Sequence, residues 1–230
     1  MISFWQRLLN LMAPEACAVC GARLSAEEKV MCASCNLHLP RTGFSAHAYD
    51  NLMARRFWGR IPIERAAALF YYEAGSEVSE IIRRLKYRDR PEIGTVMGHM
   101  AAEEFAIDGF FDGVDAIIPI PLERKRQHQR GYNQSMEIAR GVAEVTHLPI
   151  LAHVVRRKSF AGSQTHKSLR ERMENVEGVF EAVDASGIEG RHLLFIDDIV
   201  TSGATVCSCV ETLTALHDIK VSVMSLGVVR

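Results

Sequence analysis

The stretch that most constrains the fold of this 230-residue chain is an apolar run followed by two acids and a loop of small residues. The run, residues 193–196, has no polar position, which is typical of a central parallel strand covered on both faces. The acids are Asp197 and Asp198, and residues 206–216 after the loop are predicted to form a helix. The loop consists of Thr201, Ser202, Gly203, Ala204 and Thr205. The stretch therefore predicts a strand–loop–helix unit of an α/β protein.

This unit has the chemistry of a binding site for a phosphorylated sugar. A small loop that leads into a helix offers backbone N–H groups and the positive end of the helix dipole to a phosphate. Carboxylates accept hydrogen bonds from vicinal hydroxyls, and open α/β sheets bind ligands at the carboxyl ends of their strands. Walker A and dinucleotide loops need a Gly-Lys pair or three glycines, whereas this loop has Gly203 alone. The alternative is an ordinary strand–turn–helix without a ligand.

The acid pair and the Thr-Ser-Gly-Ala-Thr loop resemble the phosphoribosyl pyrophosphate (PRPP) motif of type I phosphoribosyltransferases. The resemblance implies that residues 201–205 hold the 5′-phosphate, that Asp197 and Asp198 hold the ribose hydroxyls, and that Mg²⁺ accompanies PRPP. The family often has an acid at the position of Thr201, which serves as general base in purine-salvage enzymes. Thr201 cannot take that role, so the acceptor and the catalytic residue stay unknown.

A second strand is predicted at residues 114–121, where two prolines end it. Four cations follow within ten residues: Arg124, Lys125, Arg126 and Arg130. Cations in a loop at the carboxyl end of a parallel strand suit a pyrophosphate, and arginine suits bidentate contacts with it. The alternative for any one of them is a solvated surface charge. We read this stretch as a loop that leads into a helix ending near residue 145.

Two C-x-x-C pairs lie near the N-terminus, at Cys17 and Cys20 and at Cys32 and Cys35. Four thiolates at this spacing complete a tetrahedral zinc site. All four positions of such a site are taken, so the metal is expected to be structural. Reduced thiols or two disulfides are the alternatives. We expect residues 1–45 to form a short helix and this zinc module, and residues 46–230 to form the main domain.

The charges are unevenly distributed, although the net charge is only −1. Residues 114–172 carry 11 Lys/Arg against 5 Asp/Glu, and residues 173–230 carry 3 against 9. A basic segment suits an anionic ligand, either pyrophosphate or nucleic acid. No apolar run approaches the roughly 20 residues of a membrane span, and the N-terminus does not have the pattern of a signal peptide. We therefore expect no membrane insertion and a cytoplasmic location.

Further elements are predicted from local patterns along the chain. We expect strands at residues 66–72, 151–155, 176–182 and 220–229, and helices at residues 78–87 and 93–105. Arg55, Arg56, Phe57 and Trp58 are interpreted as an exposed patch beside the zinc module. The predicted fold class is α/β, with a type I phosphoribosyltransferase-like parallel sheet flanked by helices and a small N-terminal zinc-binding module of four cysteines.

The order of the motifs along the whole chain resembles the ComF family, the amidophosphoribosyltransferase-like proteins of bacterial natural transformation. The shared features are the two C-x-x-C pairs, Pro119-x-Pro121, the Arg130-Gly-Tyr-Asn-Gln134 helix start and the acid-pair loop. The resemblance also implies a flexible loop that closes over PRPP, with Gln164, Arg172 and Asn175 as its functional residues. It implies a role in DNA uptake, with single-stranded DNA and a competence helicase as partners.

Two functions from different classes remain open at this point. The first is a phosphoribosyltransferase that acts on an unidentified acceptor. The second is a non-enzymatic scaffold or single-stranded DNA-binding competence factor that uses the same fold. A third, weaker hypothesis is a DNA-binding zinc ribbon attached to an inert domain. Sparse aromatic residues in the basic segments argue against strong DNA binding, because stacking on aromatic rings supports the binding of single strands.

Overall fold

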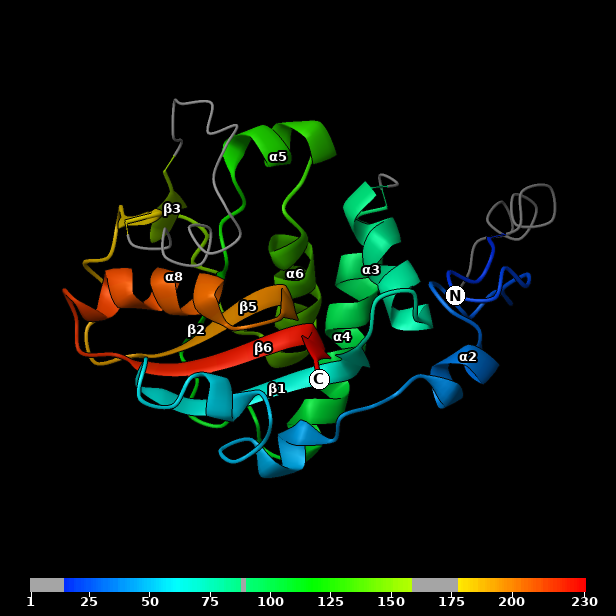
Figure 1. Ribbon diagram of the computed structural model, residues 1–230, viewed down its shortest axis with the longest axis horizontal. Coiled ribbons are helices and arrows are strands. Elements are labelled where there is room, and N and C mark those ends of the chain that lie inside the picture. Colours follow the sequence, from blue (N-terminus) through cyan, green and yellow to red (C-terminus); the bar gives the residue numbers. More distant parts are fainter. Residues whose placement is uncertain (1–14, 88–89, 159–177) are drawn as a thin grey trace.

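The centre of the protein is a four-stranded parallel sheet with the strand order β1-β6-β5-β2 (Figure 1). The computed structural model describes residues 15–87, 90–158 and 178–230. The strands are β1 (Ile63–Tyr72), β2 (Ala116–Pro119), β5 (His192–Val200) and β6 (Lys220–Val229). The α/β prediction is confirmed: a parallel sheet lies among helices, and a cysteine cluster lies near the N-terminus.

Strand β5 lies inside the sheet and is covered on both faces, as its apolar run predicts. Residues 193–196 are fully buried, and β6 beside it is buried from Val221 to Val228. The pairing partners of β5 differ in length. The register with β2 ends at Ile196, whereas the register with β6 continues to Val200. The last residues of β5 therefore have a neighbouring strand on one side only.

The helices divide between the two faces of the sheet. The chain crosses the sheet from β1 to β2 through α3 (Glu77–Tyr87) and α4 (Glu92–Ile107), and α6 (Gln134–Thr146) packs against α4. It returns from β5 toward β1 through α8 (Ala204–Thr214), which leads into β6. Because parallel crossovers are right-handed, crossings in opposite directions place their helices on opposite faces. These four helices confirm four helices predicted from the sequence, whereas residues 1–14, where the short N-terminal helix is expected, lie outside the described residues.

Two predictions in the basic half of the chain were incomplete. The cationic stretch after β2 is not an irregular loop but contains a short helix, α5 (Arg124–Arg130). The strands expected at residues 151–155 and 176–182 are β3 (Val155–Arg157) and β4 (Phe180–Ala182), which form a separate antiparallel pair. Local patterns did not predict this pairing, because it joins residues on either side of a long intervening segment.

The N-terminal segment runs along the β1 edge of the sheet (Figure 1). It contains helix α2 (Ala33–His38) and two 3₁₀ turns, η1 (Phe44–His47) and η2 (Ala54–Arg56). The amide of Thr42 donates to the carbonyl of Leu69 at 3.2 Å, and Ser45 Oγ donates to Asp108 Oδ2 at 2.6 Å. These contacts hold the connecting segment against β1 and the end of α4.

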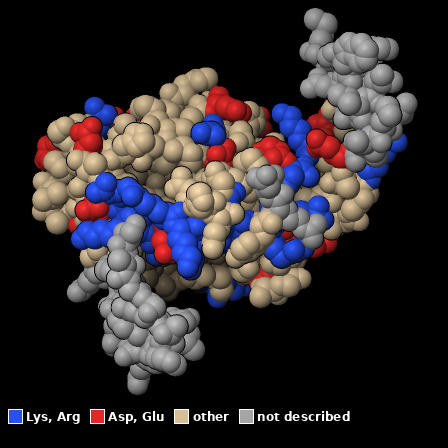
Figure 2. Space-filling view, turned by 90° about the horizontal axis from the view of Figure 1, so that it is seen from above, with Lys and Arg blue, Asp and Glu red and all other residues tan. Residues whose placement is uncertain are grey.

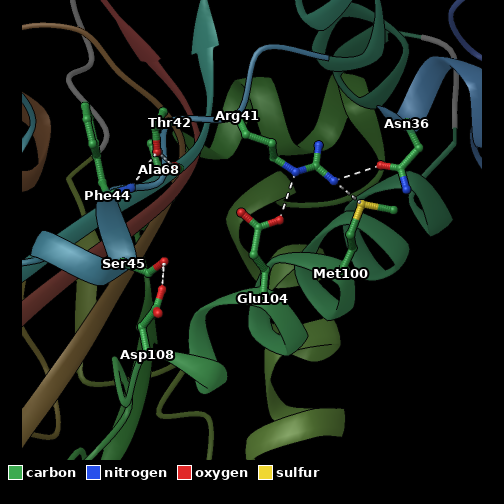
Figure 3. Close-up of polar contacts among 9 residues, drawn as sticks. All are labelled: Asn36, Arg41, Thr42, Phe44, Ser45, Ala68, Met100, Glu104 and Asp108. Carbon is green, nitrogen blue, oxygen red and sulfur yellow. Dashed lines mark hydrogen bonds and ion pairs between the residues drawn. The ribbon is translucent and has the colours of Figure 1, made fainter. Parts of the chain in front are cut away.

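Arg41 links the cysteine-containing segment to the body of the protein (Figure 3). Its Nε donates to Glu104 Oε2 at 2.8 Å, and its Nη2 donates to Asn36 Oδ1 on α2 at 2.8 Å. The guanidinium also lies 4.5 Å from the centre of the Phe70 ring on β1. One side chain thus contacts α2, α4 and the sheet.

None of the helices in the described part of the chain has both the length and the apolar character that crossing a membrane requires.

Candidate functional site

The acid pair lies in the last part of β5, beyond the point where β2 stops. The strand is longer than predicted, because β5 continues through Asp197 and Asp198 to Val200. Their backbone is held by β6, where Asp197 is in register with Ser225. This placement agrees with the rule that ligands bind beyond the carboxyl ends of parallel strands.

The two carboxyl groups have different environments. Burial and the neighbouring Asp198 carboxylate raise the pKa of Asp197 to about 7. Asp197 Oδ1 accepts hydrogen bonds from the backbone N–H of Asp198 at 2.9 Å and from Ser135 Oγ at 3.3 Å. Asp198 Oδ2 instead lies 3.0 Å from the Lys86 ammonium at the end of α3. The pair therefore holds one readily protonated carboxyl and one carboxylate with a counter-ion.

The predicted phosphate loop joins β5 to α8, as expected. Thr201 and Ser202 are exposed, and Gly203 is the N-cap of α8 with φ +76°, in the left-handed region that glycine tolerates. A Cβ atom at Gly203 would lie 2.7 Å from the ring of Phe57, so the close packing also requires glycine here. Ala204 and Thr205 open the eleven-residue helix α8, whose first N–H groups have no partner within the helix.

Two arginines from the N-terminal segment contact the carbonyl side of this loop. Arg56 Nη1 donates to the carbonyl oxygens of Val200, at 3.3 Å, and of Thr201. Arg60 Nη1 donates to the carbonyl oxygen of Ser202 at 2.9 Å. Arg56 and Phe57 were predicted to belong to an exposed patch, but Phe57 is fully buried and Arg56 is engaged with the loop. Trp58 and Arg55 do remain exposed.

The four predicted pyrophosphate residues lie on α5. Arg124, Lys125 and Arg126 are exposed, whereas Arg130 is partly buried at the end of the helix, where its Nη1 donates to Gln134 Oε1 at 2.7 Å. The Arg130 guanidinium also stacks on the ring of Tyr87, 5.0 Å from its centre. Arg130 and Tyr87 thus join α5 to the end of α3, next to the Lys86–Asp198 ion pair.

A cleft of about 710 Å³ opens between the ends of α3 and α5. Its lining includes Lys86, Tyr87, Arg126, His128 and Arg130. The basic side chains of this part of the molecule continue toward β3, where Arg124, Arg156, Arg157 and Lys158 line a second, smaller cavity. Figure 2 shows Lys and Arg gathered on this face of the protein. The arrangement presents a positive surface to an anion near the acid pair.

Several residues of this region were not predicted as parts of the site. Lys86 pairs with Asp198 from the end of α3, and Ser135 contacts Asp197 from the start of α6. Burial lowers the pKa of Arg157, and the positive charge of Arg126 acts in the same direction. Their sequence signals are weak, because each contact joins residues that are far apart along the chain. The flexible-loop residues Gln164, Arg172 and Asn175 lie outside the described residues.

The four N-terminal cysteines form a compact group. All four Sγ atoms lie within 4.8 Å of one another, a spacing that could hold a metal ion. Burial opposes ionisation of the Cys17 thiol, but hydrogen bonds from the backbone N–H groups of Cys20 and Cys32 lower its pKa to about 6. Gly21, with φ +74°, closes the turn after the first pair. All six cysteines are described and free, so the disulfide alternative is not realised.

Comparisons with known proteins agree with the resemblance that the order of the motifs indicated. No family model matches the chain. The chain is 27% identical over 205 residues to DNA utilization protein YhgH of Shigella flexneri, a match that covers 86% of this chain and 83% of that protein. It is 32% identical over 93 residues to competence protein F of Haemophilus influenzae, which covers 40% of this chain and 41% of that protein.

Among solved structures, the chain is similar to a glutamine PRPP amidotransferase from B. subtilis complexed with ADP and GMP. The identity is 20% and the TM-score is 0.40. The match covers 61% of this chain and 30% of the amidotransferase chain, so this protein spans less than a third of that enzyme.

Proposed function

This chain is a homologue of DNA utilization protein YhgH and of competence protein F, and from that premise we propose that it is a PRPP-binding, phosphoribosyltransferase-like protein that serves DNA uptake. The predicted resemblance to the ComF family is confirmed by these relatives. We place the protein in the cytoplasm, with residues 1–45 as the metal-binding module and residues 46–230 as the PRPP-binding domain.

The observation that carries this proposal is the position of the acid pair relative to the loop. Asp197 and Asp198 lie in β5 beyond the end of its β2 neighbour, and the chain passes within three residues into the helix-capping loop. A ribose 5-phosphate has its vicinal hydroxyls and its phosphate at opposite ends of one small ring. A carboxyl pair and a helix N-terminus on one short segment suit these two ends.

In this proposal each group of residues has one role. Asp197 and Asp198 accept hydrogen bonds from the ribose 2′- and 3′-hydroxyls, and residues 201–205 bind the 5′-phosphate through their N–H and hydroxyl groups. Arg124, Lys125, Arg126 and Arg130 neutralise the pyrophosphate, since α5 lies across the cleft from Lys86. Gln164, Arg172 and Asn175 are proposed to act from the loop that closes over the ligand.

Two metals belong to the proposal. Zn²⁺ suits the four-cysteine group, because four thiolates complete its tetrahedral shell and leave no open position for catalysis. Mg²⁺ would arrive with PRPP, bound to pyrophosphate and ribose oxygens, because it prefers oxygen ligands and retains waters. In this region, the described groups that could bind a Mg²⁺–PRPP complex are the carboxyl groups of Asp197 and Asp198.

If the protein is an enzyme, the reaction is a substitution at C1 of the ribose. The bond between C1 and the pyrophosphate oxygen breaks, both electrons leave with the oxygen, and the acceptor's lone pair forms the new bond to C1. Cations on α5 would stabilise the charge that develops on pyrophosphate. The acceptor and the base that takes its proton are not identified by any described residue.

A second candidate function is supported by the basic face. Arg124, Arg156, Arg157 and Lys158 extend the positive surface from α5 to β3 (Figure 2). A strip of this kind suits the backbone of single-stranded DNA, and a competence helicase would be the protein partner. Aromatic platforms for base stacking are sparse there, which favours PRPP as the primary ligand.

Calorimetric titration with PRPP and Mg²⁺ tests the first candidate. We expect binding in the micromolar range, lost in the double variant Asp197→Asn with Asp198→Asn and retained in the control Asp184→Asn, whose carboxyl is exposed after the end of β4. Unchanged affinity in the double variant would refute the ribose assignment. If the wild-type protein binds no PRPP but binds single-stranded oligonucleotide with a steep salt dependence, the second candidate replaces the first.

A further inference from the structure

The phosphate loop rests on a support that is not part of the strand–loop–helix unit. The support is the η2 turn and the residues after it, about 140 positions earlier in the chain. Arg56 Nη1 donates to the carbonyls of Val200 and Thr201, and its Nη2 donates to the carbonyl of Val229 at the end of β6. One guanidinium therefore joins the ends of two neighbouring strands.

Arg60 belongs to the same support and contacts the next carbonyl of the loop. Its Nη1 donates to the carbonyl of Ser202 at 2.9 Å and also to the carbonyl of Arg56 at 3.1 Å. The ring of Phe57, between the two arginines in sequence, lies against Gly203. Three successive residues of the loop, 201–203, thus each contact a residue of the support.

These contacts determine which way the loop's N–H groups point. In a planar trans peptide the N–H points opposite to the C=O of the same peptide unit. Because the carbonyls of Thr201 and Ser202 point toward Arg56 and Arg60, the N–H groups of Ser202 and Gly203 must point away from them. Neither N–H donates to another backbone carbonyl within the described chain. Two adjacent N–H groups on the open side form a cradle for an anion.

The charges of the two arginines act in the same direction as this geometry. Arg56 is partly buried, and burial lowers its pKa, whereas Arg60 is exposed. Neither Arg56 nor Arg60 forms an ion pair with a carboxylate among the described residues. Two positive charges without acidic partners therefore lie on the carbonyl side of the loop, and the field of the partly buried Arg56 favours an anion on the open side.

We propose that Arg56 and Arg60 are positioning residues that fix the loop 201–204 in the conformation that binds a phosphate monoester. The proposal rests on the proposed function, since it concerns the same loop. It adds that the N-terminal connecting segment is part of the binding machinery, although Arg56 and Arg60 do not touch the ligand. Arg55, their neighbour, contacts Asp50 at 2.7 Å and the Trp58 ring and does not contact the loop.

The test is calorimetric titration with ribose 5-phosphate, using Arg56→Met and Arg60→Met, with Arg55→Met as the matched control. We expect affinity about tenfold lower in Arg56→Met, corresponding to one or two lost charge-assisted hydrogen bonds. Arg60→Met, which loses one loop contact, is expected to bind about threefold more weakly, and Arg55→Met within about twofold of the wild type. Affinity in Arg56→Met equal to that of the wild type would overturn the proposal.

Chemical rescue separates a positioning role from a general loss of structure. In Arg56→Ala, free guanidinium at non-denaturing concentration should fill the vacated position and restore most of the affinity, while Arg55→Ala should not respond. Failure of rescue, in a variant whose circular dichroism matches the wild type, would contradict the specific guanidinium contacts.

A ligand-free measurement keeps the inference separate from the proposed function. NMR order parameters of the backbone amides of residues 201–204 should be lower in Arg56→Met than in the wild type and unchanged in Arg55→Met. If the wild-type protein binds no ribose 5-phosphate, the proposed function fails, and the order parameters still decide whether Arg56 orders the loop. Equal order parameters in Arg56→Met and the wild type would overturn the inference.

Discussion

Asp197 is the residue whose charge state decides the chemistry of the acid pair. Two adjacent carboxylates in a partly dry space repel each other, and Lys86 neutralises only Asp198 directly. The pKa of Asp197 is raised to about 7, so near neutral pH a proton is available to the pair. An acid pair that carries one negative charge, with a lysine beside it, suits a neutral diol better than a bare divalent cation.

Replacing Asp197 by Asn should make stability less sensitive to pH. In the wild type the folded state holds a proton up to about pH 7, whereas the unfolded carboxyl releases it near 3.8. Between these values stability falls as the pH rises, and above them the loss is complete. Relative to the wild type, Asp197→Asn should therefore gain stability across this interval, by at most about 1.4 kcal/mol per pH unit.

Urea denaturation of both proteins at about pH 4.5 and about pH 8 measures this difference. A stability difference that is the same at both pH values would contradict the raised pKa of Asp197. Asp184→Asn is the control, since this exposed carboxyl shows no resolved shift in pKa.

At the scale of elements, the packing of α4 against α6 places the start of α6 beside the acid pair. Glycines allow the two helices to approach closely: a Cβ at Gly94 would lie 2.7 Å from the Cβ of Glu137, and one at Gly141 would collide with the backbone carbonyl of Thr95. Ser135, two residues into α6, then reaches Asp197. The helix crossing is thus part of the construction of the site.

Gly141→Ala is expected to lower the free energy of unfolding by at least about 3 kcal/mol. Alanine favours a helix over glycine by about 1 kcal/mol, but here the added methyl group meets backbone atoms that cannot move without separating α4 from α6. Chemical denaturation measures the change. Gly187→Ala is the control, because that position has open space and an ordinary backbone conformation. A neutral or stabilising effect at Gly141 would show that the helices tolerate a wider spacing.

The sequence predicted elements well where a local pattern determines them. The amphipathic spacing of residues 78–87 predicts a helix that forms close to its expected bounds, and the apolar run 193–196 predicts a strand that forms but continues to Val200. Helix α5 was missed because its seven residues are all polar and carry no apolar periodicity. The local motif predicts the acids and the loop, but it contains no information on Lys86, Arg56 or Arg60. These residues reach the site only through the tertiary fold, over separations of more than 100 positions.

At the scale of the whole molecule, Arg41 is a polar link between the cysteine module and the domain. Arg41 contacts Asn36 on one side and Glu104 on the other, and its Nη1 is buried without a hydrogen-bond partner. The module itself buries few apolar residues, which are Cys17, Ala18, Leu24, Val30 and Met31. So few apolar residues cannot stabilise a fold of this size without a cross-link or a metal. They belong to the same hydrophobic cluster as the sheet, but most of that cluster lies in the sheet and its helices.

Removal of the metal should therefore unfold the module and leave the sheet intact. In the metal-loaded protein treated with a chelator, amides of residues 17–35 should lose protection from hydrogen exchange, because nothing then cross-links the four cysteines and the module's core is too small to compensate. Amides of β5 and β6 should keep theirs, since these strands are buried without help from the module.

Arg41→Met with the metal retained is the control: it should loosen the attachment of the module while residues 17–35 stay protected. Protected amides in this range after metal analysis confirms its removal would show that the module folds without a metal. Loss of protection in β5 would instead show that the module stabilises the whole domain.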